Sequence, residues 1–307
     1  MPSLEAALAT TDVVGVVTQP DRPKGRGLEV LPCPVKIRAL ERGLPVFSPS
    51  SLKKASDELA RLDEFLGARE RPDFVLVTAY GNLLPQRFLD LARRGPINVH
   101  ASLLPRWRGA APIQRAIEAG DTTTGVCLQR MVMALDAGPL LAEHATPITP
   151  SLSSARAFVE LAQEGGKLLA SYLATDPLEL VGQPQDEALV TIAAKIRKEE
   201  GFVDPTSWSL AQLHNRVRAF DPWPGVKTRL ADGTEMKILE TRDLRADTED
   251  GSLYLVRRET EIFVAKGKGL LKLARVQFPS KPAQEASVAL RNFFDRTSGS
   301  ELTLLPL

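Results

Sequence analysis

The chain has 307 residues, which is enough for one large domain or two ordinary ones with a substantial core. Its 43% apolar and 25% charged residues are typical of a globular protein. Because 39 basic and 38 acidic residues give a net charge of +1, overall charge supports no nucleic-acid partner, and any such surface must be local.

The few cysteines and histidines exclude several classes of site. Cys33 and Cys127 lie far apart, which excludes a disulfide scaffold or a thiolate zinc cluster and fits a reducing compartment. No two of the three histidines are four residues apart on a helix, so we expect no metal. Without an apolar stretch of transmembrane length or a signal peptide, we expect a cytoplasmic protein with no membrane partner.

Strands and helices alternate through the first half of the chain. Continuous β-rich runs at 12–18 and 73–79 predict buried parallel strands, and residues 152–174 have the apolar spacing of a long helix. Shorter predicted strands are 45–47, 97–100, 124–131 and 139–148, and shorter helices are 3–10, 35–43, 52–67 and 112–119. This order predicts an α/β fold with a doubly wound, mostly parallel sheet over residues 1–175.

The second half of the chain differs from the first in composition and in the spacing of its apolar residues. Residues 176–207 are rich in Pro, Gly, Gln and Asp with little periodicity, which predicts a linker over the surface. A helix at 210–220 then precedes five short β-rich segments, at 226–230, 235–244, 253–257, 261–265 and 270–278. We expect residues 208–307 to form a small β-barrel of the OB type.

The stretch 96–112 contains the first candidate for chemistry. If residues 97–100 form a strand, Asn98 and His100 share a face, because side chains repeat every second residue. The Pro- and Gly-rich loop that follows places them at a strand's carboxyl end, where open α/β sheets build sites. The alternative is a structural histidine beside a turn asparagine.

Asp136 is a more distant candidate. A neutral imidazole can take a proton from an attacking amine, a carboxylate can orient that ring, and an amide can donate to an oxyanion. Asp136 follows a predicted strand, between Leu135 and Gly138, and its spacing alone favours a plain turn aspartate.

Two basic elements could contact phosphates. Arg22, Lys24 and Arg26 alternate with Pro and Gly in an exposed loop, which could equally be a solvated loop. Residues 262–284 contain a run of cations without an acidic residue between them, including Lys266, Lys268 and Lys272. On an OB-type barrel this tract indicates a nucleic-acid surface, although a basic edge strand would look similar.

At these residues the chain resembles a known family. Two segments are similar to the signature of the formyltetrahydrofolate-dependent formyltransferases: Asn98-Val99-His100-Ala101-Ser102-Leu103-Leu104-Pro105 and Leu135-Asp136-Ala137-Gly138. Three more resemble the members that formylate methionyl initiator tRNA: 18–27, 105–114 and Pro222-Trp223-Pro224-Gly225. The resemblance covers both predicted domains and the linker.

The resemblance implies formyl transfer from 10-formyltetrahydrofolate to the α-amine of methionyl initiator tRNA, by a monomer without a metal. By motif position, Asn98, His100 and Asp136 are the catalytic trio, and the Asp136 spacing fits the family. Ser102, Leu103, Leu104 and Pro105 would line the folate site. The arm around Arg26 would reach the acceptor stem, and the barrel would hold the tRNA backbone.

One departure from the family concerns the N-terminus. The family begins with a strand and a glycine turn ahead of the first helix, whereas Met1 falls near that helix's last turns. We therefore expect the first strand to be missing, which would leave its neighbours unpaired and residues 1–307 weakly stable and weakly active. Two alternatives stay open, a formyltransferase for a small amine and an inactive, truncated RNA-binding relic.

Overall fold

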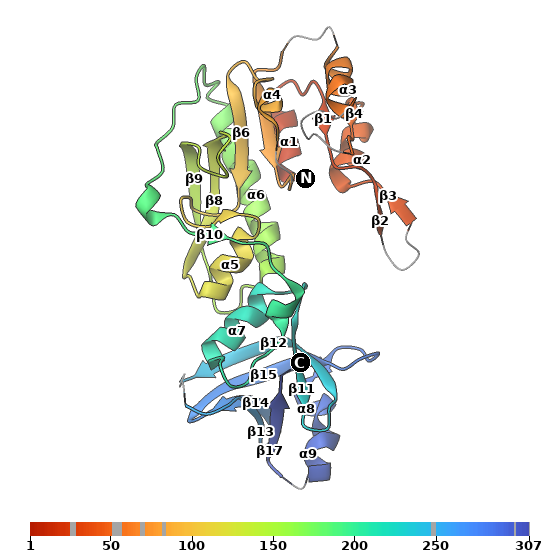
Figure 1. Cartoon of the computed structure of the whole chain (residues 1–307), viewed down its shortest axis with the longest axis vertical. Coiled ribbons are helices and arrows are strands. Elements are labelled where there is room, and N and C mark those ends of the chain that lie inside the picture. The colour runs from red at the N-terminus through yellow and green to blue at the C-terminus, as the bar shows by residue number, and fades with distance from the viewer. Residues whose placement is uncertain are drawn as a thin grey trace. The chain divides into compact units, whose positions relative to one another are not determined.

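The computed structural model describes residues 1–24, 29–50, 57–67, 71–81, 84–246, 250–297 and 299–306. The chain forms two compact units. The first comprises Met1–Ala110, Gly125–Thr146 and Val159–Ile192, and the second comprises Ala111–Thr124, Pro147–Phe158 and Ala193–Leu307. Figure 1 labels their helices and strands.

The first unit contains two sheets with parallel strands. β5 (Phe74–Thr78) pairs in parallel with β6 (Gly95–His100), and the order β5-β6-β8-β9 continues through β8 (Thr123–Arg130) and β9 (Leu140–Pro147). β1 (Val16–Val17) pairs in parallel with β4 (Val46–Phe47) in a separate sheet. The α/β class is confirmed. β8 runs antiparallel to β6, which the sequence did not indicate because a buried apolar strand has the same pattern in either direction.

Helices occur where the apolar spacing predicted them. Their bounds are α1 (Pro2–Thr10), α2 (Pro34–Glu41), α3 (Asp57–Leu66), α4 (Gln86–Leu89), α5 (Pro112–Ala119) and α6 (Ser154–Leu173). The predicted basic loop instead contains an antiparallel hairpin, β2 (Arg22–Lys24) and β3 (Glu29–Leu31). Among the described helices, none combines the length and apolar composition that a membrane span requires. The expectation that the family's first strand is missing from residues 1–307 stays a prediction.

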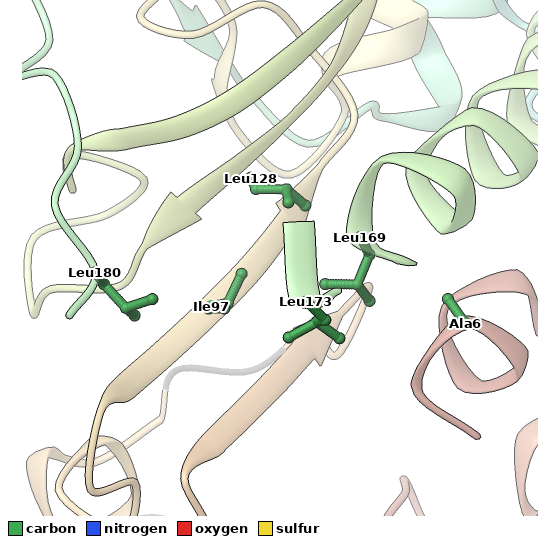
Figure 2. Close-up of a cluster of buried hydrophobic side chains, with 6 residues drawn as sticks. All are labelled: Ala6, Ile97, Leu128, Leu169, Leu173 and Leu180. Carbon is green, nitrogen blue, oxygen red and sulfur yellow. The ribbon is translucent and has the colours of Figure 1, made fainter. Parts of the chain in front are cut away.

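One face of the four-stranded sheet is apolar. Figure 2 shows Ile97 of β6 and Leu128 of β8 together with Leu169 and Leu173 of α6, and both strand residues are fully buried. Ala6 of α1 and Leu180 complete this core. Because strand side chains alternate, the neighbouring residues Asn98 and Gln129 point to the opposite face.

The second unit contains a closed β-barrel. Its strands are β11 (Val226–Leu230), β12 (Glu235–Arg245), β13 (Tyr254–Arg258), β14 (Glu261–Lys266), β15 (Gly269–Gln277) and β17 (Glu301–Leu305). The order β12-β11-β17-β13-β14-β15 closes through pairing of β12 with β15, and short β16 (Gln284–Glu285) adds to β15. Helices α7 (Leu210–Ala219), α8 (Ala286–Ala289) and α9 (Arg291–Thr297) belong to this unit. The OB-type barrel is confirmed, with β17 as a sixth strand beyond the five predicted.

The predicted linker contains short ordered elements. They are η1 (Glu187–Leu189), β10 (Ile192–Ala193), which pairs with β7 (Arg108–Gly109), and η2 (Lys198–Gly201). Within the first unit, the backbone of Gln183 exchanges hydrogen bonds of 2.8 and 2.9 Å with Leu140, and Thr191 accepts a 2.9 Å bond from the Arg108 amide. The part of the linker before Ile192 is thus tied to the first unit. The predicted domain boundaries at 175 and 208 stay predictions.

His214 of α7 is a buried polar residue of the second unit, only 8% exposed. Its Nε2 lies 3.1 Å from the Pro150 carbonyl oxygen, so Nε2 carries the proton, and Nδ1 lies 2.9 Å from the Thr241 hydroxyl. Burial, helped by the nearby Arg218 cation, lowers the pKa of His214 from 6.5 to about 4. The native ring is therefore neutral near pH 7.

This histidine should make the protein sensitive to acid. Between pH 6.5 and 4 the unfolded chain binds a proton that the folded chain does not, so the free energy of unfolding should fall as the pH drops through this range. The loss should be at most roughly 3 kcal/mol. Denaturant unfolding at pH 7 and pH 4.5 should show a smaller loss for His214→Gln. His144→Gln, at an exposed position, should keep the wild-type loss, and equal losses in all three chains would contradict this expectation.

Candidate active site

The polar face of the four-stranded sheet carries the candidate residues at the end of β6. The antiparallel register pairs Asn98 with Gln129 and His100 with Cys127, so all four side chains lie on the face opposite the apolar core. His100 is 6% exposed and is the last residue of β6. The alternation inferred from the sequence therefore places an amide and an imidazole side by side at the end of a strand.

The His100 ring is oriented by the loop that follows β6. Its Nε2 lies 3.1 Å from the Trp107 carbonyl oxygen, which can only accept, so Nε2 carries a proton. Trp107 has a φ of +65°, a conformation that bulky residues rarely adopt. In the neutral ring, Nδ1 is then the basic nitrogen, and it lies 3.7 Å from Asp136 Oδ1.

Asp136 presents its carboxylate to this ring from the turn between β8 and β9. Its Oδ1 accepts a 3.0 Å hydrogen bond from Gln129 Nε2, and its Oδ2 accepts a 2.9 Å bond from the Gly109 backbone amide. Its φ of +48° is in the left-handed region that aspartate tolerates. Both oxygens of Asp136 are thus held by residues outside its own turn, Gln129 of β8 and Gly109 of β7, which a plain surface turn would not require.

The turn itself depends on a glycine. A Cβ atom added to Gly138 would lie 1.6 Å from the Arg130 carbonyl oxygen, so the chain can close here only without a side chain. The Arg130 amide donates a 3.0 Å bond to the Pro139 carbonyl at the same point. The backbone that carries Asp136 is therefore tightly closed.

Three further polar groups surround this pair. Asn98 is half-buried and makes no side-chain hydrogen bond within the described residues, so its amide can donate to a ligand. Gln129 is 1% exposed, and its Oε1 is a buried acceptor without a partner among the described atoms. Burial raises the pKa of the Cys127 thiol to about 12, so it stays protonated and is a poor nucleophile.

The segment proposed for the folate is divided between interior and surface. Ser102 is fully buried and its hydroxyl donates a 2.7 Å bond to the Arg106 carbonyl, and Leu104 is 3% exposed. Leu103 and Pro105 are only half-buried. Ser102 and Leu104 thus shape the loop, whereas Leu103 and Pro105 keep surface that a ligand could contact.

The basic residues have different environments. Arg22 and Lys268 are exposed, and Lys272 is paired with Glu261. The side chain of Lys24, and the whole of Arg26, lie outside the described residues.

The environment of Lys266 contradicts the expectation that this residue contributes to a nucleic-acid surface. Its side chain is 2% exposed and its ammonium donates a 2.9 Å hydrogen bond to the Trp208 carbonyl. An ammonium enclosed in this way has no surface to offer a phosphate, so Lys266 is excluded from any RNA-binding surface.

Three residues of the site were not identified from the sequence. Gln129 is a polar residue that directly follows the apolar run 126–128 of β8, and its position there was an available signal. Arg108 lies within the resembling segment 105–114 but was given no role, and Gln185, which contacts both Arg108 and the Asp136 turn, had no sequence signal of its own. Among the described residues, no group of three or more His, Cys, Asp or Glu side chains could hold a metal ion.

An amide without a hydrogen-bond partner among the described residues, a basic imidazole nitrogen and a fixed carboxylate suit the transfer of a group to a nucleophile whose proton must be removed. Comparison with known families makes this specific. Residues 3–173 match the formyl transferase family model, and residues 195–293 match the model of the formyl transferase C-terminal domain. The chain therefore belongs to the formyl transferase family and is a formyl-transferring enzyme.

Two relatives that are similar over most of this chain are both methionyl-tRNA formyltransferases. A methionyl-tRNA formyltransferase of Marinobacter nauticus is 40% identical over 96% of this chain and 91% of its own length. One of Pseudomonas paraeruginosa is 45% identical over 90% of this chain and 87% of its own.

Solved structures share the fold at low identity. An N-formyltransferase from Helicobacter canadensis, in complex with folinic acid and dTDP-3-aminofucose, has a TM-score of 0.61 at 14% identity and covers 88% of this chain and 93% of its own. HypX from Aquifex aeolicus, in complex with tetrahydrofolic acid, has a TM-score of 0.56 at 17% identity and covers 91% of this chain and 47% of its own.

Proposed function

We propose that this enzyme transfers the formyl group of 10-formyltetrahydrofolate to the α-amine of methionyl initiator tRNA. The observation that carries the proposal is the basic nitrogen of His100, 3.7 Å from a carboxylate held at both oxygens. This pair of groups occurs in a chain that is 40–45% identical to methionyl-tRNA formyltransferases over 90–96% of its own length.

Each of the side chains of Asn98, His100 and Asp136 has a separate role in the proposed reaction. The α-amine attacks the formyl carbon, a new carbon–nitrogen bond forms, and Asn98 donates a hydrogen bond to the developing oxyanion. One such donor is typically worth ~10²–10³ in rate. His100 Nδ1 takes the amine proton, and Asp136 stabilises the imidazolium; a positioned base is worth ~10²–10⁴. Breakage of the bond to the folate nitrogen, which receives a proton, completes the transfer.

No covalent enzyme intermediate is required. Cys127 lies opposite His100 in the sheet, but its raised pKa keeps the thiol protonated, and the Ser102 hydroxyl is committed to the Arg106 carbonyl. Direct attack by the amine is the simpler course.

The substrates would be held by the elements that the sequence indicates. We assign Leu103 and Pro105, with the loop shaped by Ser102 and Leu104, to the folate. We assign Arg22, Lys24, Arg26, Lys268 and Lys272 to the tRNA backbone, since cations on exposed arms and barrels contact phosphates without reading sequence. A cytoplasmic monomer stays our prediction.

An acceptor assay tests this function. The purified chain is given 10-formyltetrahydrofolate with methionyl initiator tRNA, or with a small amine such as glycinamide ribonucleotide or an amino sugar. We expect formylation of the charged tRNA alone. Faster transfer to a small amine would instead indicate a small-amine formyltransferase, and no transfer to any acceptor would indicate an inactive protein.

Substitution at the proposed trio should affect turnover rather than binding. We expect His100→Ala and Asp136→Ala to lower kcat by about 10²- to 10⁴-fold, because each removes part of the base. KM for the charged tRNA should change little, since neither side chain is among those assigned to the tRNA backbone. Steady-state kinetics decide this, and near-wild-type kcat in either variant would refute its assigned role.

The basic arm should affect binding rather than turnover. Arg22→Gln combined with Arg26→Gln should weaken tRNA affinity and lower its dependence on salt, because two fewer phosphate contacts release fewer counterions. Binding measured between about 50 and 200 mM salt checks the slope. Lys266→Met is the matched control in the barrel, because its ammonium is buried, and it should leave the slope unchanged.

A further inference from the structure

Gln185, in the segment after α6, contacts the turn that carries Asp136. Its Nε2 donates two hydrogen bonds, one of 2.8 Å to the Asp136 carbonyl oxygen and one of 2.7 Å to the Gly138 carbonyl oxygen. A single amide group thus ties together the two ends of the short segment that begins with Asp136.

The other end of this amide is also held. Gln185 Oε1 accepts a 3.0 Å hydrogen bond from Arg108 Nε. This contact sets the orientation of the amide, because a flipped group would bring its oxygen against two carbonyl oxygens and its nitrogen against a guanidinium. The assignment of Nε2 as the donor to the turn is therefore the only one that satisfies every partner.

Arg108 completes a closed network around the turn. Its side chain is 8% exposed, and its two terminal nitrogens pair with Glu187 at 3.2 and 2.8 Å. The next residue, Gly109, donates its backbone amide to Asp136 Oδ2 at 2.9 Å. The short strand 108–109 therefore holds the Asp136 carboxylate directly and the Asp136 backbone through Gln185.

The position of this backbone matters because the carboxylate faces His100 at only 3.7 Å. Asp136 has a φ of +48°, which its surroundings must maintain. A displacement of about 1 Å at a catalytic group can cost ~10²-fold in rate. Gln129 and Gly109 hold the carboxylate oxygens, and Gln185 locates the backbone from which they extend.

We propose that Gln185 is a positioning residue, which holds the Asp136 turn so that the carboxylate faces His100. The reaction that it serves is the one given under the proposed function. The segment predicted as a linker is then part of the active-site support, and Arg108 and Glu187 fix the amide that does the holding.

Two variants and one matched control test this role. Gln185→Ala removes three hydrogen bonds, and Gln185→Glu keeps an acceptor for Arg108 but has no donor for the two carbonyls. Gln183→Ala is the control, because this exposed glutamine lies on the same segment and its hydrogen bonds with Leu140 are made by the backbone, which the substitution keeps.

Hydrogen exchange reports on the turn independently of catalysis. We expect faster amide exchange in residues 131–139 of both Gln185 variants and wild-type exchange in Gln183→Ala. Unchanged exchange in both Gln185 variants would overturn the proposal, whatever reaction the enzyme catalyses. If wild-type enzyme did not formylate methionyl-tRNA, the proposed function would fail while this measurement still decided the positioning role.

Kinetics then show whether Gln185 acts through Asp136. In the wild-type background both Gln185 variants should lower kcat by about 10- to 100-fold, with little change in KM for either substrate. In an Asp136→Ala background the same substitutions should have no further effect on kcat, because the group that they position is absent. Equal fold-losses in the two backgrounds would show a merely structural role and contradict the proposal.

Discussion

The fixed carboxylate of Asp136 is the constraint on which the rest of the site depends. A partly buried charge needs hydrogen-bond donors, and here they come from the Gln129 side chain and the Gly109 backbone amide. The turn that supplies the carboxylate can close only at a glycine and contains a residue with positive φ. Several separate segments must therefore be in place before the carboxylate can face His100.

The sheet connects this site to the core. Ile97 and Leu128 bury one face against α6, while Asn98, His100 and Gln129 lie on the other face of the same two strands. A slip of one residue in the pairing of β6 and β8 would exchange these faces. The apolar core thus determines the register, and the register places the amide and the imidazole together.

Much of this arrangement was predictable from local patterns, and some was not. The alternation around Asn98 and His100 depends only on strand periodicity, and the barrel followed from regularly spaced β-rich segments. Lys266 was misjudged because a run of cations does not show which side chains point inward, and this one is enclosed. β17 was missed although its residues alternate between exposed and buried, because five residues near the chain's end are too short a pattern to separate a strand from a loop; in the barrel it lies between β11 and β13.

By itself, the sequence determined the α/β and barrel classes, the strand that ends in Asn98 and His100, and the resemblance to formyltransferases. These depend on local periodicity and on motifs of adjacent residues. Only the tertiary structure decided which groups hold Asp136 and which segment supports its turn. Gln185 is an ordinary glutamine in a polar stretch, and its three hydrogen bonds exist only because folding brings the chain back across the turn. Contacts between distant segments have no local signature, so they become visible only in the folded chain.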